Sequence, residues 1–306
     1  MGIKNRTGEV GINNQGVEMK IITYRNANDI DVEFPNGYVK QSVLYKSFKA
    51  GAINHVDYSE RIGEVRHTFF GSEIEIIDYV NSDSVVVRFD NGHIKKTSWG
   101  NFNIGDVRSP YCKTMCGVGF LGEGNYTTKD LWYDYWRAMI ERVYRTGHYA
   151  RKWYSDVLVC DEWHNYQNFA QWCTDNFYKV KDSKMNLDKD IIVKHNKIYS
   201  PQTCVFVPSF INTLFIRAEN ARGDLPIGVY WHDRDQGYRA QCSYINVETG
   251  KRKNKWLGNH ENSIDAFNAY KTFKEAHIKY LANYYKEVIP ENLYHVMMNY
   301  IVEITD

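Results

Sequence analysis

The chain has little charge imbalance, no long apolar run and no closely paired cysteines. Its 38 Lys and Arg nearly balance its 37 Asp and Glu, which gives a formal net charge of +1. This balance excludes a basic field over the whole surface, so a nucleic-acid partner would have to be met by local patches. The lack of a signal peptide or a membrane-length apolar run predicts a cytoplasmic protein with reduced thiols and no membrane partner.

The six cysteines do not form a metal-binding pattern. They are Cys112, Cys116, Cys160, Cys173, Cys204 and Cys242, and no two of them make a Cys-x-x-Cys pair. Cys112 and Cys116 are spaced Cys-x-x-x-Cys, but no second Cys or His pair follows at the spacing of a zinc ribbon. We therefore expect no structural zinc.

Length and aromatic content bound the organisation. A chain of 306 residues predicts two or more domains. Aromatic residues make up 15% of it, including 24 Tyr and 8 Trp. Most of these rings are expected to fill cores and interfaces, and some can stack on bases or sugars. We expect an α+β multidomain protein divided at residues 1–57, 58–111, 112–220 and 221–306.

The first 111 residues contain a duplicated module. RTGEV at Arg6–Val10 returns as RIGEV at Arg61–Val65, 55 residues later. The same offset matches further residues of the two copies: Gly16 with Gly71, Ile21 with Ile76, Tyr24 with Tyr79, Phe34 with Phe89, and Gly37 with Gly92. The second copy then loses one residue, so that Phe48 matches Phe102. So dense a set of matches indicates an internal repeat.

Each copy has the pattern of a small β module. The apolar segments Asp29–Phe34 and Ser84–Phe89 are both followed by Asn-Gly, a hairpin signal. About 50 residues with several short strands predict two Src-homology-3-like β-barrel repeats. Residues 1–111 carry 13 Lys and Arg against 14 Asp and Glu, so they have no basic bias. Two roles stay open: adaptor modules for DNA or a protein partner, and a stabilising tandem without a site.

Two amphipathic helices are predicted in the centre of the chain. The first spans about Lys129–Thr146, with Thr127 and Asp130 resembling a capping box and Gly147 as its stop. The second begins near Asp161. Their apolar stripes, from Leu131 to Tyr144 and from Trp163 to Phe177, predict core packing and a helical platform for the next segment.

The segment Leu187–Pro208, LDKDIIVKHNKIYSPQTCVFVP, concentrates polar chemistry. Leu187–Val193 is predicted to be a strand with Asp188 and Asp190 on one face and Lys189 on the other. A loop with His195 and Asn196 follows. Ser200-Pro201 then predicts a short helix, Cys204–Val207 a strand, and Ser209–Arg217 a closing helix.

This order resembles the HNH nuclease core of phage-type and homing endonucleases, in which His-His-Ile-Asp, a gap and Asn precede a short helix and an apolar strand. Asp188-Lys189-Asp190-Ile191 and Asn196 follow that frame, and the resemblance extends over about Gly117–Phe215. It implies a ββα-metal centre that hydrolyses phosphodiesters with one Mg²⁺ or Mn²⁺ ion. The catalytic set it implies is Asp188, Lys189, Asp190, His195 and Asn196, with Asp188, Asp190 and Asn196 as metal ligands.

The sequence departs from the family at the general base. Lys189 stands where the family has the base histidine, and a lysine between two carboxylates stays protonated. Lys189 is therefore expected to neutralise phosphate charge, and His195 is the candidate replacement base. The alternatives are a solvated strand edge for the two aspartates, a plain surface loop for His195, and a turn residue with left-handed geometry at Asn196.

Residues 228–285 predict a three-stranded sheet followed by a helix. The strands are Gly228–Asp235, Gly237–Ile245 and Lys251–Glu261, and the helix begins near Ser263. Its apolar face carries Ala266, Tyr270 and His277, with His277 expected in the core. The segment after Pro290 is expected to pack on the body as a helix or a strand.

Gly228-Val229-x-Trp231, Tyr238-Arg239-Ala240, Trp256-Leu257-Gly258 and Ala266-x-x-Ala269-Tyr270 resemble APETALA2-type DNA-binding domains. The resemblance implies that the sheet enters a major groove of double-stranded DNA. Candidate DNA-binding residues are Trp231, Arg234, Arg239, Lys251, Arg252, Lys253, Lys255 and Trp256. The alternatives are a solvated hairpin for the lysines and packing against the helix for the two tryptophans.

Three functions follow, the first two from these resemblances and the third from the N-terminal duplication. The first is a site-specific, metal-dependent DNA endonuclease of phage or mobile-element type, acting in a bacterial cytoplasm during infection or at the nucleoid. The second is a catalytically silent DNA-binding regulator or inhibitor derived from such a nuclease. The third is a protein-interaction module in which the N-terminal repeats bind the partner.

Overall fold

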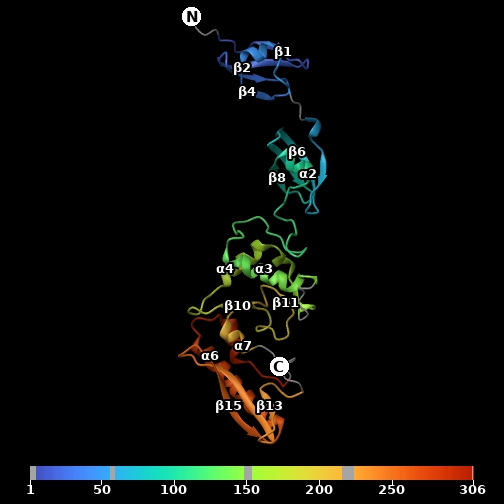
Figure 1. Cartoon of the computed structure of the whole chain (residues 1–306). Coiled ribbons are helices and arrows are strands. Elements are labelled where there is room, and N and C mark those ends of the chain that lie inside the picture. Colours follow the sequence, from blue (N-terminus) through green and yellow to red (C-terminus); the bar gives the residue numbers. More distant parts are fainter. Residues whose placement is uncertain (1–4, 56–58, 148–153, 216–223, 305) are drawn as a thin grey trace. The chain divides into compact units, whose positions relative to one another are not determined.

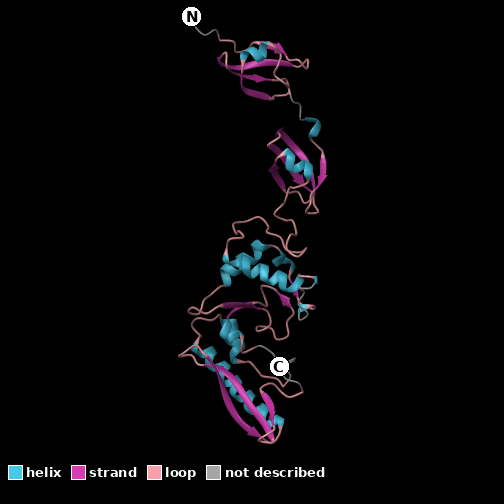
Figure 2. Cartoon of the chain, viewed as in Figure 1, coloured by secondary structure: helices cyan, strands magenta, loops and turns pink. Residues whose placement is uncertain are grey.

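The computed structural model describes residues 5–55, 59–147, 154–215, 224–304 and 306 (Figure 1). It divides into two compact units, Met1–Cys112 and Lys113–Asp306. The described residues form a mixed α+β protein with several small sheets, which confirms the α+β class (Figure 2). The expected boundaries at 57/58 and 220/221 lie outside the described residues.

The first unit contains two copies of one antiparallel sheet followed by a short helix. Repeat 1 consists of β1 (Val10–Ile12), β2 (Glu18–Asn26), β3 (Asp29–Glu33), β4 (Val39–Val43) and α1 (Tyr45–Lys49). Repeat 2 consists of η1 (Ser59–Arg61), β5 (Val65–His67), β6 (Glu73–Asn81), β7 (Ser84–Phe89), β8 (Ile94–Thr97) and α2 (Trp99–Ile104). Both sheets follow the chain order, and no strand pairing closes either described sheet into a barrel.

The duplication extends to register and core. The β2–β3 ladder shifts between Ile21 and Thr23, and the β6–β7 ladder shifts at the matching Ile76 and Asp78. Each repeat has its own core, built on Ile21, Ile30 and Phe48 in repeat 1 and on the corresponding Ile76, Val85 and Phe102 in repeat 2. The predicted strands and Asn-Gly turns are confirmed, because Gly37 and Gly92 have φ of 80° and 85° in turns that leave β3 and β7.

The central region is built on two packed helices. The predicted helices are α3 (Leu131–Tyr144) and α4 (Tyr166–Asn176), preceded by the 3-10 turn η4 (Asp161–His164). Trp136 and Trp163 are fully buried between them, which confirms the predicted stripes, but Leu131 is 58% exposed and lies off the stripe. The predicted helix end at Thr146, before Gly147, is two residues late, since α3 ends at Tyr144.

The predicted platform is also present. Strand β10 (Met185–Asp188) pairs antiparallel with β12 (Val205–Pro208), and α5 (Ser209–Asn212) follows. Phe206 of β12 lies among Trp172 of α4, Trp132 of α3 and Phe177, with ring centroids 5.6, 6.3 and 5.0 Å away. A two-residue parallel ladder joins β9 (Leu158–Val159) to β11 (Ile198–Tyr199). The β10–β12 hairpin therefore rests on the helices.

Three local predictions in this region are wrong. The strand expected over Leu187–Val193 ends at Asp188, because the Asp188 side chain binds the following backbone N–H groups and turns the chain away. The helix expected at Ser200 is a single turn, closed by the N–H groups of Thr203 and Cys204 on the Ser200 carbonyl. The closing helix expected over Ser209–Arg217 is shorter than predicted: it ends at Asn212, residues 213–215 are not helical, and residues 216–217 lie outside the described residues.

The C-terminal region matches the predicted sheet and helix. β13 (Val229–His232), β14 (Gly237–Ile245) and β15 (Arg252–His260) form an antiparallel sheet in chain order, against α6 (Ser263–Tyr284). α7 (Glu291–Met298) then packs on α6 as a helix. Gly228 is required where the sheet meets the helix, because a Cβ there would lie 2.0 Å from the ring of Tyr270. The core of α6 and α7 is continuous with Val207 and Ile211 of the central region.

Candidate functional site

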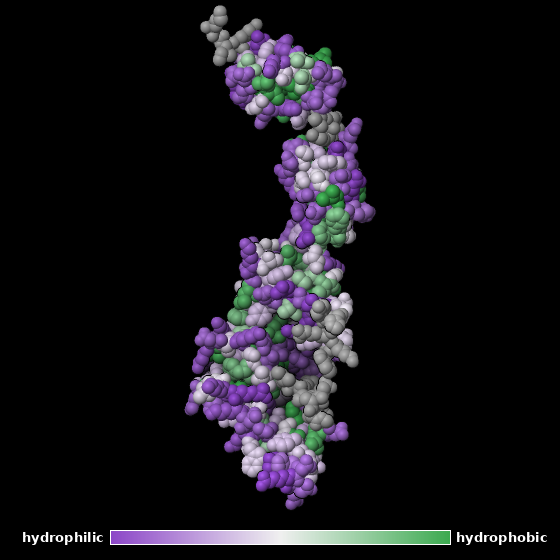
Figure 3. All heavy atoms as spheres, viewed as in Figure 1, coloured by the Kyte–Doolittle hydropathy of each residue, from purple (hydrophilic) through white to green (hydrophobic). Residues whose placement is uncertain are grey.

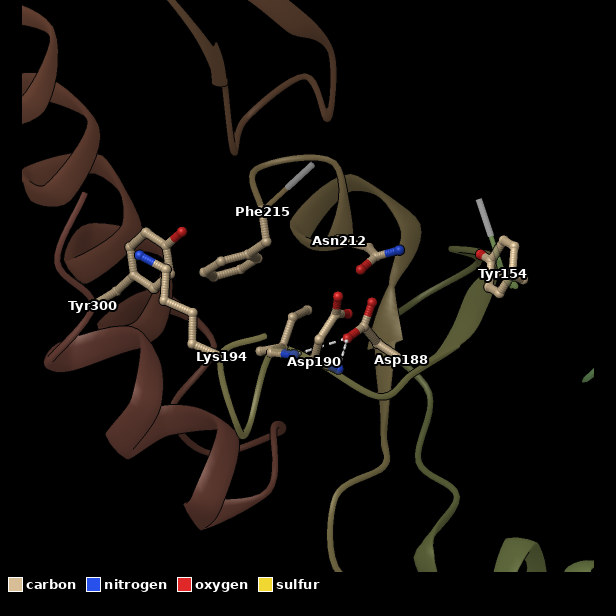
Figure 4. A pocket seen from close by; sticks show the side chains of 8 residues that line it. Tyr154, Asp188, Asp190, Lys194, Asn212, Phe215 and Tyr300 are labelled. Carbon is tan, nitrogen blue, oxygen red and sulfur yellow. Dashed lines mark hydrogen bonds between the residues drawn. The ribbon is translucent and has the colours of Figure 1, made fainter. Parts of the chain in front are cut away.

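A cavity of about 290 Å³ lies where the end of β10, the loop after it, α5 and the segment after α7 come together. Its lining combines acidic, amide and aromatic side chains: Tyr154, Asp188, Asp190, Ile191, Lys194, Asn212, Phe215 and Tyr300. Figure 4 shows the carboxyl groups of Asp188 and Asp190 and the amide of Asn212 directed into the same space. The two predicted aspartates are therefore brought together.

The aspartates meet through a turn rather than through strand alternation. Asp188 Oδ1 accepts the backbone N–H groups of Asp190 and Ile191, both at 2.9 Å. This turn carries Asp190 round to the cavity beside Asp188. Burial, with the neighbouring Asp190 charge, raises the pKa of Asp188 to about 6, against the opposing effect of the backbone hydrogen bonds. A carboxyl group that resists ionisation in a cavity marks a candidate site for a cation or a proton.

Lys189 does not line the cavity. Its side chain is buried, and Nζ donates to the carbonyl of Asn196 at 3.1 Å and lies 3.3 Å from Asp190 Oδ2. It was expected to point away from the aspartates and meet phosphate. Instead its ammonium group fastens the loop between residues 189 and 196.

Asn196 fastens the same loop from the other side. Its Nδ2 donates to the carbonyls of Lys189 and Ile198, both at 2.7 Å, and its Oδ1 accepts the Ile198 N–H at 3.3 Å. Both ends of the amide are thus bound to backbone, which fits the turn alternative better than a metal ligand. The left-handed backbone expected at Asn196 belongs to His195, with φ of 67°. His195 is exposed and does not line the cavity.

Six lining residues were not among the predicted set. Asn212 and Phe215 lie in the segment of the predicted closing helix, and Ile191 and Lys194 lie inside the motif itself, so these four had a positional signal. Tyr154 and Tyr300 come from distant parts of the chain and had none. Figure 4 shows Lys194 directed toward Tyr300.

Lys194 is neutralised by acidic groups. Its Nζ lies 2.8 Å from Asp306 Oδ1 and 3.1 Å from Glu303 Oε2. Its charge is therefore compensated outside the aspartate pair.

The donor set limits what the cavity can hold. Within the described ranges, no three His, Cys, Asp or Glu side chains gather as a metal site. Two carboxylates and an amide remain a fitting set for Mg²⁺ or Mn²⁺, because Mg²⁺ commonly keeps several waters and uses one or two carboxylates with substrate phosphates. Asp190 and Asn212 would contribute directly, and Asp188 supplies the second carboxylate beside them.

The second candidate site is the face of the β13–β15 sheet opposite α6. Cross-strand partners share a face, so the pairings Tyr230 with Arg239, Arg239 with Asn259, Gln241 with Trp256 and Ser243 with Asn254 assign these side chains to it. Trp256 is 62% exposed, so the alternative of packing against the helix is wrong for this residue. Figure 3 shows hydrophilic residues over the tip of this sheet.

The predicted DNA-binding residues divide between the two faces. Arg252 lies on the open side, where its Nη2 donates to Ser243 Oγ at 2.9 Å. Lys253 and Lys255 pair with Tyr244 and Cys242, so they alternate to the helix side of the edge strand. Lys251 precedes β15 and is exposed, as is Arg234 in the β13–β14 turn.

Acidic side chains of the β13–β14 turn hold two of the predicted residues. Arg239 Nε donates to Asp235 Oδ2 at 2.8 Å, with a second bond from Nη2, and this raises the pKa of Arg239. Trp231 Nε1 donates to Asp233 Oδ1 at 3.0 Å, and its ring packs edge-on against Tyr238. Asp235 would compete with phosphate for Arg239.

No protein-family model matches the chain, and neither a curated protein nor a solved structure is detectably similar to it. The HNH and APETALA2-type resemblances thus rest on the quoted motifs. Over the part of the chain that is described, no helix has the length and apolar character to cross a bilayer.

Proposed function

We propose that the protein binds double-stranded DNA and hydrolyses a phosphodiester bond with one divalent metal ion. The observation that carries the proposal is the pair Asp188 and Asp190 in one cavity, with burial raising the pKa of Asp188. A carboxylate pair in which burial disfavours ionisation is more typical of a functional site than of a structural one. The finer fold belongs to the same proposal: Src-homology-3-like repeats and a ββα-metal centre formed by β10, β12 and α5.

The roles follow from exposure. The Asp190 side chain is 42% exposed and, with Asn212, would hold Mg²⁺ or Mn²⁺ together with water. When bound, the ion stabilises charge on the phosphate and the leaving oxygen. Asp188 is more deeply buried, and its raised pKa makes its carboxylate the best candidate in the cavity to accept a proton from water. Asn196 and Lys189 would hold the loop in shape.

DNA recognition is assigned to the open face of the sheet. Arg239, Arg252 and Trp256 would contact bases and backbone, and the amides of Gln241 and Asn254 can pair with adenine edges. Lys251, Lys253 and Lys255 would contribute phosphate contacts from the rim, which steepens the salt dependence of binding.

The test is nicking of supercoiled plasmid with Mg²⁺ or Mn²⁺, using both random sequence and the protein's own genomic locus. We expect nicking by the wild type, loss of nicking with retained duplex binding in Asp188→Asn, and no change in Asp182→Asn, an exposed carboxylate that does not line the cavity. Absence of wild-type nicking on every substrate would remove the hydrolytic part of the proposal.

The second candidate is a catalytically silent DNA-binding regulator or inhibitor. It is favoured by the backbone bonds that occupy Lys189 and Asn196 and by the position of His195 outside the cavity. Its signature is duplex binding in gel shifts without nicking under any metal condition. Absence of duplex binding even at low salt would contradict both candidates.

A further inference from the structure

The two N-terminal repeats share a turn whose backbone is the same and whose side chains differ. The turn is Asn13–Gly16 in repeat 1 and Thr68–Gly71 in repeat 2. In each, the glycine has φ of 80° and its N–H donates to the carbonyl of the first residue, at 2.9 and 3.1 Å. The first side chain of each turn accepts the N–H groups two and four residues on. The two turns therefore have the same glycine conformation and the same hydrogen bonds, although their central side chains differ.

The central residues of the turn are Asn14-Gln15 in repeat 1 and Phe69-Phe70 in repeat 2. Gln15 serves its own repeat, because its Oε1 accepts the backbone N–H of His55 at 2.6 Å. Phe69 is 74% exposed, more than any other bulky apolar side chain in the described ranges, and it lies outside the core of repeat 2. The turn does not need a phenylalanine for its shape, since repeat 1 forms it without one.

A second apolar side chain extends this surface. The N–H of Phe69 donates to the carbonyl of Gly105 at 3.0 Å, which fixes the turn beside the end of α2. There Ile104 is 58% exposed, where repeat 1 has Ala50. Repeat 2 thus differs from repeat 1 by three larger apolar side chains at one end.

Cationic groups border the apolar residues. The guanidinium of Arg108 lies 4.3 Å over the Phe70 ring, and Lys95 Nζ donates to the Arg108 carbonyl at 2.7 Å. Arg66, on β5 three residues before Phe69, is exposed. Two exposed acids also lie near the turn: Asp106, which follows α2, and Glu73, which pairs with His67 across the β5–β6 ladder. The three cationic groups thus outnumber the acids around the apolar residues.

We propose that Phe69, Phe70 and Ile104, bordered by Arg66, Lys95 and Arg108, form a docking surface for a protein segment that presents an apolar side chain between carboxylates. Charge complementarity and the exposed apolar anchors favour this occupant. Duplex DNA is disfavoured, because residues 58–111 carry six Lys and Arg against eight Asp and Glu. A second copy of the chain is disfavoured as the partner. The few side chains of this surface would bury less than the roughly 800 Å² per partner that a stable dimer buries.

The test uses the full chain and a fluorescein-labelled peptide, Asp-Glu-Leu-Phe-Glu-Asp, in anisotropy titrations. The variant is the double substitution Phe69→Asn with Phe70→Gln, which installs the residues that the same turn already accommodates in repeat 1. We expect the dissociation constant to rise at least about tenfold, the loss typical of removing a hot-spot side chain. Thermal unfolding verifies that the variant is folded.

The matched control is Ile12→His, which removes a side chain 68% exposed on repeat 1 and installs the residue found at the matching position of repeat 2. It should leave peptide binding unchanged. A peptide with lysines in place of the acids should bind more weakly. Equal binding by the Phe69→Asn, Phe70→Gln variant, equal binding of the lysine peptide, or loss of duplex binding in that variant would each overturn the proposal, whatever the outcome of the nicking assay.

Discussion

Asp188 is the residue whose ionisation is most disfavoured by its surroundings among the carboxyl groups with a resolved shift. Its folded pKa of about 6 lies above the ordinary value of 3.8, so the folded state binds this proton more tightly than the unfolded chain does. The stabilising contribution is complete below about pH 4 and is lost as the pH rises through 6. At neutral pH the charged form therefore costs stability.

Asp188→Asn should consequently raise the melting temperature at pH 7–8. The amide removes the buried charge and keeps an oxygen that can accept the Asp190 and Ile191 N–H groups. We expect a gain of roughly 1–2 kcal/mol at pH 7 that shrinks toward zero near pH 4. Scanning calorimetry across this range, with Asp182→Asn as control, measures it. A variant less stable than wild type at pH 7 would contradict the burial argument.

His277 should contribute a pH dependence of the opposite sign. It is a core histidine, as predicted, and its Nε2 accepts the Ile245 N–H at 2.9 Å. Burial, with the nearby Lys274 charge, lowers the pKa of His277 to about 4 from 6.5. Because the unfolded chain takes up the proton first, this contribution is present above about pH 6.5 and is lost as the pH falls toward 4.

His277→Gln tests this dependence, since glutamine does not titrate. The variant should be less stable than wild type at pH 7, and the difference in melting temperature should narrow toward pH 4.5. A difference between wild type and His277→Gln that does not change with pH would show that His277 is not held neutral by the fold.

At the scale of elements, the basic and aromatic residues of β15 divide between the two faces of the sheet, which the composition of the strand does not reveal. Arg252 and Trp256 lie on the open face, and Lys253 and Lys255 alternate to the helix side. We predict that Arg252→Ala or Trp256→Ala weakens duplex binding at least about tenfold, because each removes a direct contact.

Lys253→Ala or Lys255→Ala should instead change mainly the slope of affinity against salt concentration, by up to about one. Gel shifts or anisotropy at several salt concentrations separate the two effects. Equal losses for all four substitutions would mean that the hairpin binds by charge alone and that the open face is not the contact surface.

The sequence predicted correctly those elements, such as α6, whose structure follows from one periodic pattern of apolar residues. The α6 helix begins at Ser263 as expected, after an Asn262 side chain that accepts the Asp265 N–H at 2.9 Å. The loop after β10 was mispredicted, because a side chain of Asp188 competes with the strand for backbone partners. Asn212 and Tyr300 reach the cavity through tertiary packing, which local patterns do not encode.

At the scale of the whole molecule, the chain consists of two units with separate cores. We predict that residues 113–306 fold without the repeats and bind duplex DNA with the affinity of the full chain, because the open sheet face and the acidic cavity lie entirely within them. Circular dichroism melts and gel shifts of this fragment are the measurements. Loss of DNA binding in a folded fragment would assign DNA contacts to the repeats.

The duplication was visible in the sequence because spaced identities survive at one offset, 55 residues, until a single deletion. The difference between the two copies at this turn was harder to recognise from the sequence. Phe69-Phe70 and Asn14-Gln15 occupy one turn, and only the backbone geometry establishes that they are equivalent.

Lys189 and Asn196 donate to each other's main-chain carbonyls, so each depends on the other to hold the loop. This reciprocity constrains how the sequence can change. In Lys189→His the side chain would be shorter, and it would either bind within the loop or face solvent. In neither case would its imidazole lie in the cavity. The residues at these two positions are therefore expected to vary together among any relatives of the chain.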